Sequence, residues 1–419
     1  MVGGRNGTIV IVEAQLSQPG IIWPEIAADL GYRVIFLSNN IDRYKKVPSF
    51  AHALCRDDVD TRAGDTNSCD GILAAVAALP EPDDVRALFS QCDYNIVVVA
   101  EAAAKLGLPG LNVSSALRAR NKLFARRAYL EYGVQAPAFE HAGTAEEAGH
   151  AAEKIGFPCV VKPMTAAGSV NVALCRNADE VLDRFAIIAG ESLDLRGQRK
   201  PPGILVEEYC QGYEVSVETI TFKGMTHVIG VIDKSLGPHP HFAETGHVFP
   251  SCLPSSITSE LADVACAGLA AIGFDFGAAH TEIKMTAAGP RLIETNARLC
   301  GAELPDLIES ATGIRLRHEV LAMHAGGSPG LTAWSHRGAA TRRFTATRPG
   351  VLREIRGAEE ARAAFGVIDV GFEVRPGDVV KPAASALEIL GHVRTIAGTP
   401  AEALRMADAA FSHVTFVIG

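Results

Sequence analysis

The chain has 419 residues, 48% hydrophobic and 21% charged, which is ordinary for a soluble globular protein of two or three domains. Its net charge of −9 argues against a general nucleic-acid binder, and we expect no membrane span and no signal peptide. The nine cysteines form no CxxC pair and no regular framework, so we expect reduced thiols in a cytoplasmic protein.

The first part of the chain alternates between strand and helix patterns, which predicts a parallel α/β domain. The expected elements are strands at residues 8–12, 32–37 and 96–100 and helices at 21–30 and 102–106. The turn after the first strand, residues 13–17, lacks GxGxxG. A Rossmann cofactor site would need those glycines beside its phosphates, and we therefore reject it.

Residues 114–132 have the composition of one basic helix, which could break near Ala119. Ser114 or Ser115 is the expected N-cap and Gly133 the C-terminal stop. Besides Lys122 the helix carries four arginines. Such a charge run is usually a solvated helix face.

Residues 156–163 read as a turn followed by a short buried strand that ends in Lys162 and Pro163. The loop that follows, 164–172, consists mainly of small residues. Small residues let backbone N–H groups close over phosphates, and Lys162 would supply positive charge beside them. The loop does not match the Walker pattern, and most small-residue loops are only turns, so this signal is weak by itself.

Residues 196–202 form an expected exposed polar loop, and 204–209 with 214–220 an expected hairpin-like pair of strands. The segment 237–250 then holds three histidines, which could be metal ligands. Pro238 and Pro240 make a tetrahedral zinc arrangement unfavourable, and no cysteine joins the histidines. We interpret this segment as a substrate-facing loop.

A helix is expected at residues 258–273, and a β-hairpin follows, with strands through Glu282 and Glu294 joined by the turn 287–290. Glu282 and Glu294 can face the same side of this hairpin, with Asn296 two residues further along. Two carboxylates and an amide oxygen suit a hard cation such as Mg²⁺, and Arg298 could reach an anion held by that metal. A surface hairpin with solvated charges explains the spacing alone equally well.

The rest of the chain predicts helices at residues 305–312 and 316–325, and then a small α+β subdomain that completes the second large lobe. Its expected elements are strands at 342–346, 367–374, 387–396 and 414–418 and a helix at 400–411.

The order of these features resembles that of the ATP-grasp carboxylate–amine ligases over essentially the whole chain. Within that superfamily, residues 244–247 (Glu-Thr-Gly-His) and 296–302 (Asn-Ala-Arg-Leu-Cys-Gly-Ala) are similar to the bacterial L-amino acid ligases that make dipeptides. The resemblance implies an ATP-grasp fold of mixed α/β and α+β class. It further implies an N-terminal parallel α/β pre-ATP-grasp domain at residues 1–113, a small lid subdomain at 114–205 and a large subdomain at 206–419.

The resemblance also implies the nucleotide site. The phosphates of ATP would be contacted by Lys122 and Lys162. The loop over the β- and γ-phosphates would include Thr165, Ala167, Gly168, Ser169 and Val170. Adenine would lie against Glu207, Glu208 and Tyr209, and Glu214 would hold the ribose hydroxyls.

For the reacting groups, the resemblance implies that two Mg²⁺ ions (or Mn²⁺) are bound by Glu282, Glu294 and Asn296. Arg298 would steady the transferred phosphoryl group or the acyl phosphate. Glu244 and His247 would lie on the amino acid side. His247 could act as a base, bind the substrate carboxylate or only pack.

The implied reaction activates an amino acid or similar small carboxylic acid as an acyl phosphate and joins it to an amine, with release of ADP and phosphate. Metal ions and fixed cations are needed because negative charge develops on several oxygens at once. An acyl phosphate hydrolyses in water, so loops must close over it. The segments 164–172 and 237–250 are the two expected lids.

Three other functions stay open. An ATP-grasp ligase could load an amino acid onto a carrier protein, or use bicarbonate as a carboxylase does. A nucleotide-binding sensor with a dead site would be expected to have lost one of the charged residues named above. We expect small-molecule partners, no nucleic acid and no membrane, and a homodimer is possible.

Overall fold

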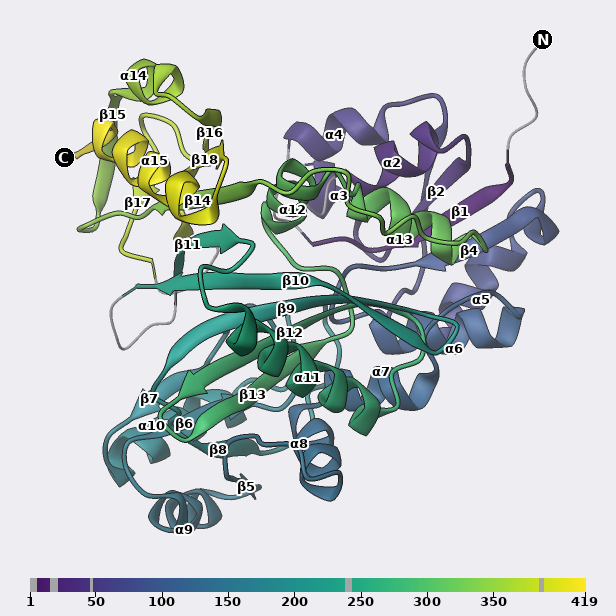
Figure 1. Ribbon diagram of the computed structural model, residues 1–419. Helices are drawn as coiled ribbons and strands as arrows, with labels where there is room; N and C mark the ends of the chain where they lie inside the picture. The colour runs from purple at the N-terminus through teal and green to yellow at the C-terminus, as the bar shows by residue number, and fades with distance from the viewer. Residues whose placement is uncertain (1–5, 16–21, 46–47, 238–242, 384–387) are drawn as a thin grey trace.

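The computed structural model describes residues 6–15, 22–45, 48–237, 243–383 and 388–419. A central antiparallel sheet separates three further parts of the molecule (Figure 1). The amino-terminal sheet lies on one side of it, a small sheet below it, and the carboxyl-terminal elements at its other end.

The amino-terminal sheet is parallel, in the order β3-β2-β1-β4. Its strands are β1 (Thr8–Val12), β2 (Arg33–Ser38), β3 (Val59–Ala63) and β4 (Val85–Phe89). Its helices are α2 (Trp23–Asp29), α3 (Ile41–Lys45), α4 (Pro48–Leu54), α5 (Cys69–Ala77) and α6 (Ile96–Leu106), and a 3₁₀ turn covers Pro82–Asp84. Every residue of β1 is buried, as expected for a parallel strand covered on both faces.

The strand expected at residues 96–100 is wrong, because these residues begin α6. The run of β-branched residues resembles a strand, but it continues into an alanine-rich stretch that ends at Gly107, a left-handed C-cap. Burial of Val99 and Ala103 against the sheet outweighs the weak local preference of valine. The true strands β3 and β4 carry charged residues and were not predicted.

Helices α7 (Val113–Arg120) and α8 (Lys122–Glu131) divide the helix expected at 114–132, close to the break considered near Ala119. The break is at Asn121, whose side chain accepts hydrogen bonds from the backbone of Leu123 and Phe124. The N-cap of α7 is Asn112 and not a serine, since the Asn112 side chain accepts from the Ser115 backbone at 2.9 Å.

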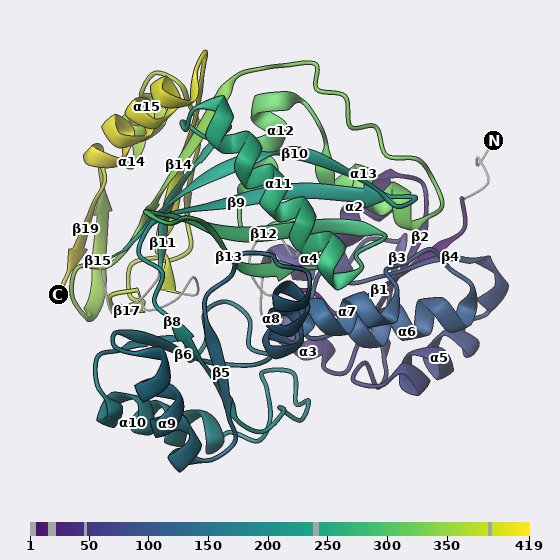
Figure 2. The ribbon, with the colours of Figure 1, turned by 60° about the horizontal axis from the view of Figure 1, so that its bottom comes forward.

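The small sheet has the antiparallel order β5-β8-β6-β7, and α9 and α10 cover its outer face (Figure 2). Its elements are β5 (Phe139–Ala142), α9 (Ala145–Ile155), β6 (Cys159–Pro163), β7 (Ala173–Cys175), α10 (Ala178–Ala189) and β8 (Ile204–Glu208). The hairpin expected at 204–220 is wrong, because β8 pairs only with β5 and β6 while the next strand joins the large sheet. The subdomain boundary expected at residue 205 falls within β8.

The large sheet has eight antiparallel strands in the order β13-β12-β9-β10-β11-β14-β18-β16. They are β9 (Tyr213–Phe222), β10 (Met225–Leu236), β11 (Glu244–Phe249), β12 (Gly277–Thr286), β13 (Gly289–Asn296), β14 (Gly338–Phe344), β16 (Val367–Phe372) and β18 (Gly391–Ala397). The segment 237–250, expected to be a loop, therefore ends in the central strand β11. Its residues 238–242, with His239 and His241, lie outside the described residues.

Helix α11 (Ser255–Ile272) is the one described helix long and apolar enough to cross a membrane by length and composition. It packs against α8 and strands β10 and β13, and its residues Leu261, Ala265 and Leu269 are buried there. This is the packing of a core helix beside a sheet.

The carboxyl-terminal elements extend the large sheet and add a short one in the order β17-β15-β19. They comprise β15 (Gly350–Arg356), α14 (Ala358–Ala363), β17 (Val379–Val380), α15 (Pro400–His413) and β19 (Thr415–Ile418). The expected α+β character is confirmed. Strands β16 and β18 leave this subdomain to form the end of the large sheet, so its residues reach the centre of the molecule.

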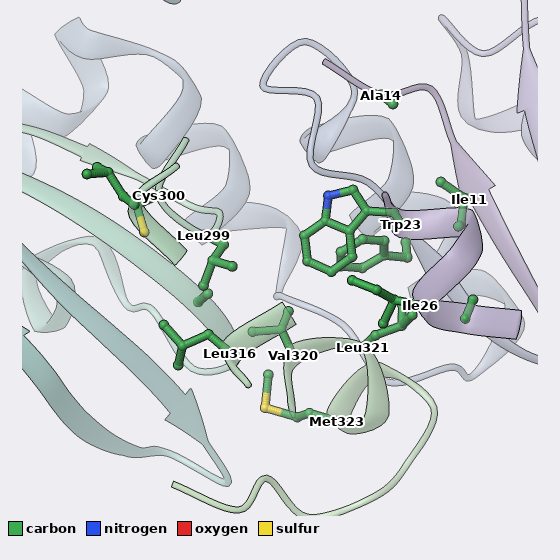
Figure 3. Packing of buried hydrophobic residues seen from close by; sticks show 14 of the residues in the cluster. Ile11, Ala14, Trp23, Ile26, Leu299, Cys300, Leu316, Val320, Leu321 and Met323 are labelled. Carbon is green, nitrogen blue, oxygen red and sulfur yellow. The ribbon is translucent and has the colours of Figure 1, made fainter. Parts of the chain in front are cut away.

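A continuous apolar core joins the amino-terminal sheet to the rest of the chain (Figure 3). Helix α12 (Leu304–Thr312) leads into α13 (Leu316–His324), and the latter packs against α2. Figure 3 shows Val320 and Leu321 of α13 facing Trp23 and Ile26 of α2. Burying each such side chain contributes about 1.5–3 kcal/mol, so this core fixes the amino-terminal sheet relative to the large sheet.

Candidate active site

One cavity of about 1120 Å³ lies where the amino-terminal, small and large sheets meet. Segments that follow the carboxyl ends of β1 and β4 line one side of it through Gln15 and Asp93. Ligands bind in this position relative to many parallel sheets. Residues of the small sheet, the large sheet and its terminal strands β16 and β18 also line the cavity.

The expected hairpin at its floor is confirmed as strands β12 and β13, but the turn expected at 287–290 is too long, because Gly289 and Pro290 already belong to β13. Glu282 lies directly opposite Glu294 in the register, and His280 lies opposite Asn296. Both carboxylates reach the cavity, and each side chain is about one-fifth exposed, at 23% for Glu282 and 22% for Glu294. The register between the strands thus places the side chains of Glu282, Glu294 and Asn296 on one wall of the cavity.

Each of these carboxylates is paired with a lysine. Glu294 Oε1 lies 2.8 Å from Lys122 Nζ, and Lys122 also donates to the carbonyl of Ala166 in the small-residue loop. Glu282 Oε1 lies 3.0 Å from Lys234 Nζ and 3.2 Å from His280 Nε2. Burial opposes protonation of His280, but Glu218 at 2.7 Å and Glu282 raise its pKa to about 9.

Lys162, at the inner end of the cavity, is held in a buried charged triad. Its Nζ lies 2.6 Å from Glu207 Oε2, and Arg126 Nε lies 2.9 Å from Glu207 Oε1. Lys162 is two residues along β6 from Val160, the partner of Glu207 on β8, so both side chains share one face of the small sheet. Burial lowers the pKa of Lys162, whereas the two cations lower the pKa of Glu207 against the effect of burial.

The loop after β6 borders the same end of the cavity. Ala167, Gly168, Ser169 and Val170 line it, whereas Thr165 does not. Gly168, Ser169 and Asn171 have positive φ angles of 65°, 59° and 61°. Left-handed residues within a turn can aim neighbouring backbone N–H groups into one concavity, which suits an anion such as phosphate.

A second cluster of charges surrounds Lys234, on the central strand β10. Its ammonium lies 2.8 Å from Glu244, 3.0 Å from Glu282 and 3.4 Å from Glu214. Although burial opposes it, these carboxylates raise the pKa of Lys234 well above its usual range. One buried ammonium therefore holds three carboxylates from neighbouring strands on the cavity face of the large sheet.

His247 lies behind this cluster and does not line the cavity. It is fully buried, and its Nε2 lies 2.9 Å from Glu244 Oε2. Burial lowers the pKa of His247, so its neutral ring donates from Nε2 to the Glu244 carboxylate. Among the residues that the structure describes, its Nδ1 has no hydrogen-bond partner, and Glu303 Oε1 lies 3.9 Å away. Of the three interpretations of His247, this burial supports packing that positions Glu244.

Arg298 lies at the junction with the amino-terminal sheet. Its Nε donates to Asp93 Oδ1 at 2.7 Å, and both residues line the cavity. Asp93 was not predicted as a site residue because it follows β4, whose charged residue is not typical of a buried strand.

The cavity extends beyond the predicted residues toward the carboxyl-terminal strands. Arg343 makes two hydrogen bonds of 2.8 Å to Glu303 and lies 3.6 Å from Glu244. The other charged side chains on this wall are Asp306, Arg317, Asp369, Glu373, His392 and Arg394. The sequence offered little signal for them, because arginines and acids in helices, short strands and loops are usually exposed.

Of the predicted site residues, the cavity brings together Lys122, Lys162, Ala167, Gly168, Ser169, Val170, Glu207, Glu208, Tyr209, Glu214, Glu244, Glu282, Glu294, Asn296 and Arg298. Within the described residues, no group of three or more His, Cys, Asp or Glu side chains is arranged to hold a metal ion by itself. Two carboxylates and one amide oxygen instead suit an ion that keeps other oxygen ligands, from water or phosphate.

Three family models match successive parts of the chain. They are an ATP-grasp N-terminal domain at residues 25–110, an ATP-grasp domain at 155–306 and an L-amino acid ligase C-terminal domain 2 at 342–419. The expected resemblance is therefore confirmed by separate matches at the front, middle and end of the chain.

Several curated proteins are similar to more than half of the chain. An uncharacterized protein from Sinorhizobium fredii is 28% identical over 88% of this chain and 76% of its own length. An alanine–anticapsin ligase from Bacillus subtilis is 27% identical over 67% of this chain. The match covers 62% of the length of that ligase, which is less than two thirds.

Among solved structures, an L-amino acid ligase from Bacillus licheniformis has a TM-score of 0.81 at 20% identity, over 99% of this chain and 100% of that one. This likeness shows a shared fold. The expected ATP-grasp fold with its parallel amino-terminal domain is confirmed.

Proposed function

Because the chain belongs to the ATP-grasp ligases and ends in an L-amino acid ligase domain, we propose that it joins an amino acid to an amine, most simply to a second amino acid. A carboxylate oxygen of the first substrate attacks the γ-phosphorus of ATP, and ADP leaves. The amine nitrogen then attacks the acyl carbon, the C–O bond to phosphate breaks, and phosphate and a proton are released.

The observation that carries this proposal is the division of the cavity into two charged ends. The Lys162 end, with Lys122 and the loop at 166–170, presents cations and backbone N–H groups, which suit the phosphates of ATP. The opposite end, around Glu244 and Arg343, presents both signs of charge, which suits a zwitterionic amino acid. The hairpin and Arg298 lie between them, where the phosphoryl group would be transferred.

The donors on the hairpin fit a hard divalent cation, and we assign Glu282, Glu294 and Asn296 to Mg²⁺, or Mn²⁺ in its place. When bound, such an ion offsets the negative charge on the phosphate oxygens. Lys122 and Lys234, which pair with these carboxylates, keep both side chains turned into the cavity. Glu208 and Tyr209 border the cavity where adenine would lie, and Glu214 where the ribose would lie.

The proposal is tested by incubating the protein with ATP, Mg²⁺ and all pairs of proteinogenic amino acids while measuring phosphate, and then identifying products by mass spectrometry. Phosphate release that needs amino acids, with a dipeptide as product, supports it. Release that needs bicarbonate or a carrier protein instead would replace it with one of the alternatives. Cytoplasmic location and a homodimeric state remain predictions.

We expect Glu244→Gln to raise the KM for the amino acid substrate much more than the KM for ATP. Glu244 is a cavity-lining carboxylate that could pair with a substrate ammonium, and His247 and Lys234 hold it in place. A hydrogen bond to a charged group contributes about 1.5–3 kcal/mol, so the KM should rise roughly 10- to 150-fold. Steady-state kinetics with each substrate varied in turn measures this. Glu260→Gln, on the exposed face of α11, is the matched control, and equal changes in both KM values would contradict the assignment.

A further inference from the structure

Arg196, in the loop between α10 and β8, reaches across to the amino-terminal sheet. The loop was expected to be exposed, and that prediction is wrong for Arg196, which is 7% exposed. Its guanidinium donates to the Ala14 carbonyl at 2.6 Å and to the Tyr44 hydroxyl at 3.1 Å. It also lies 3.6 Å from Glu13 Oε2. All three partners belong to the amino-terminal sheet and its helices.

The site that receives Arg196 is built around the buried carboxylate of Glu13. The Glu13 carboxylate accepts hydrogen bonds from Thr66 Oγ1 at 2.7 Å, from the Asn39 backbone N–H at 2.8 Å and from the Tyr44 hydroxyl. Glu13 has a φ of +54°, which is strained for a residue with a side chain and persists only where several contacts impose it. Arg43 also lies 3.6 Å from Glu13 Oε2, so Glu13 keeps four partners besides Arg196 and the receiving site should form without it.

The backbone of the loop makes a second attachment at the same place. Asn67 Nδ2 donates to the Arg196 carbonyl at 3.0 Å, and Gln198 Nε2 donates to Asn67 Oδ1 at 3.2 Å. Within the loop, Asp194 Oδ1 accepts from the backbone of Arg196 at 2.8 Å. These hydrogen bonds hold the loop in one conformation around Arg196.

Arg196 is also part of the cavity wall. Leu195 and Arg196 line the cavity together with Cys92, Asp93 and Tyr94 of the amino-terminal part. Asp93 is the partner of Arg298, to which we assign contact with the reacting group. The attachment therefore closes the wall beside the place where the acyl phosphate would form.

We infer that Arg196 is a positioning residue that anchors the small sheet to the amino-terminal sheet and keeps water out of the cavity during ligation. The sealing role rests on the proposed function. If the wall opens, water attacks the acyl carbon of the acyl phosphate, the C–O bond to phosphate breaks, and the free carboxylate is regenerated. ATP is then converted to ADP and phosphate without a product.

The test compares Arg196→Ala with Arg199→Ala, which removes an exposed arginine from the same loop. The first readout is the rate at which N-ethylmaleimide labels Cys92, followed by peptide mass spectrometry. Cys92 is 1% exposed and lines the same wall. We expect labelling at least about tenfold faster in Arg196→Ala and unchanged in Arg199→Ala, since exposure of a buried group reports local opening.

The second readout is the ratio of phosphate released to product formed. We expect it to rise at least about threefold in Arg196→Ala and to stay near one in Arg199→Ala. Arg196→Lys, which keeps the charge but loses the planar fork, should lie between them. If Arg196→Ala does not fold, Tyr44→Phe serves instead, since it removes the hydroxyl acceptor and keeps the ring.

Unchanged Cys92 labelling would overturn the anchor whatever the activity. Faster labelling with an unchanged ratio would overturn the sealing role. If the unmodified protein forms no product from any amine and carboxylate, the proposed ligase function fails, while the labelling experiment still decides the anchor.

Discussion

Replacing Glu294 with glutamine is expected to abolish phosphate release while leaving the fold intact. Glutamine keeps the volume of Glu294 but removes the charge that we assign to metal binding. Loss of metal-assisted stabilisation should cost more than about 3 kcal/mol in the transition state, a fall of over about 100-fold in kcat. A phosphate-release assay at saturating substrates measures this. Lys122 retains its bond to the Ala166 carbonyl, so no buried cation is left without a partner.

Glu260→Gln, an exposed glutamate on α11, is the control for this substitution and should keep full activity. Unchanged thermal unfolding of Glu294→Gln would show that the loss is chemical. If Glu294→Gln retains more than about a tenth of kcat, equivalent to roughly 1.4 kcal/mol, then Glu294 is not a metal ligand.

Replacing Glu207 with glutamine should instead destabilise the protein. Glu207 is 2% exposed and is shared by two buried cations, Lys162 and Arg126. Breaking a buried ion pair from one side leaves charge uncompensated and costs about 3–5 kcal/mol. Arg126 also donates to the Ile293 carbonyl of β13, so loosening it should weaken contact between the small and large sheets. Denaturant unfolding followed by circular dichroism measures the loss.

The neighbouring Glu208 provides the control, because it is exposed and its carboxylate accepts a hydrogen bond from the Ala138 backbone rather than pairing with the two buried cations. Glu208→Gln should change the free energy of unfolding by less than about 1 kcal/mol. If both variants lose the same free energy of unfolding, the ion pairs of Glu207 with Lys162 and Arg126 do not stabilise the fold more than an exposed carboxylate does.

The parts of the site that could be predicted lie close together in the sequence. Although the direct pairing of Glu282 with Glu294 depends on a bulge beside Glu282 that shifts the register, alternation of residues in β12 and β13 was enough to predict a hairpin that carries both. The same holds for Lys162 before its loop. These local patterns, and their order, led to the correct family.

The parts that could not be predicted depend on contacts between distant segments. The valines that begin α6 resemble a strand until their packing is known. Lys234 has one charged neighbour in the chain, but three carboxylates from other strands meet it in space. Arg196 lies in a polar loop whose composition indicates exposure. It is buried by contacts around the strained residue Glu13, which follows β1 and lies 183 residues earlier in the chain.

The central claim, that the carboxylate is activated as an acyl phosphate, is tested most directly by an oxygen label. The first substrate is supplied with both carboxylate oxygens as ¹⁸O, and the phosphate released during ligation is analysed by mass spectrometry. Because a carboxylate oxygen attacks the γ-phosphorus and leaves with the phosphate, the account predicts one ¹⁸O atom in inorganic phosphate, with ADP as the other product. Label in AMP, or any release of pyrophosphate, would contradict the account, together with the roles assigned to Glu282, Glu294 and Arg298.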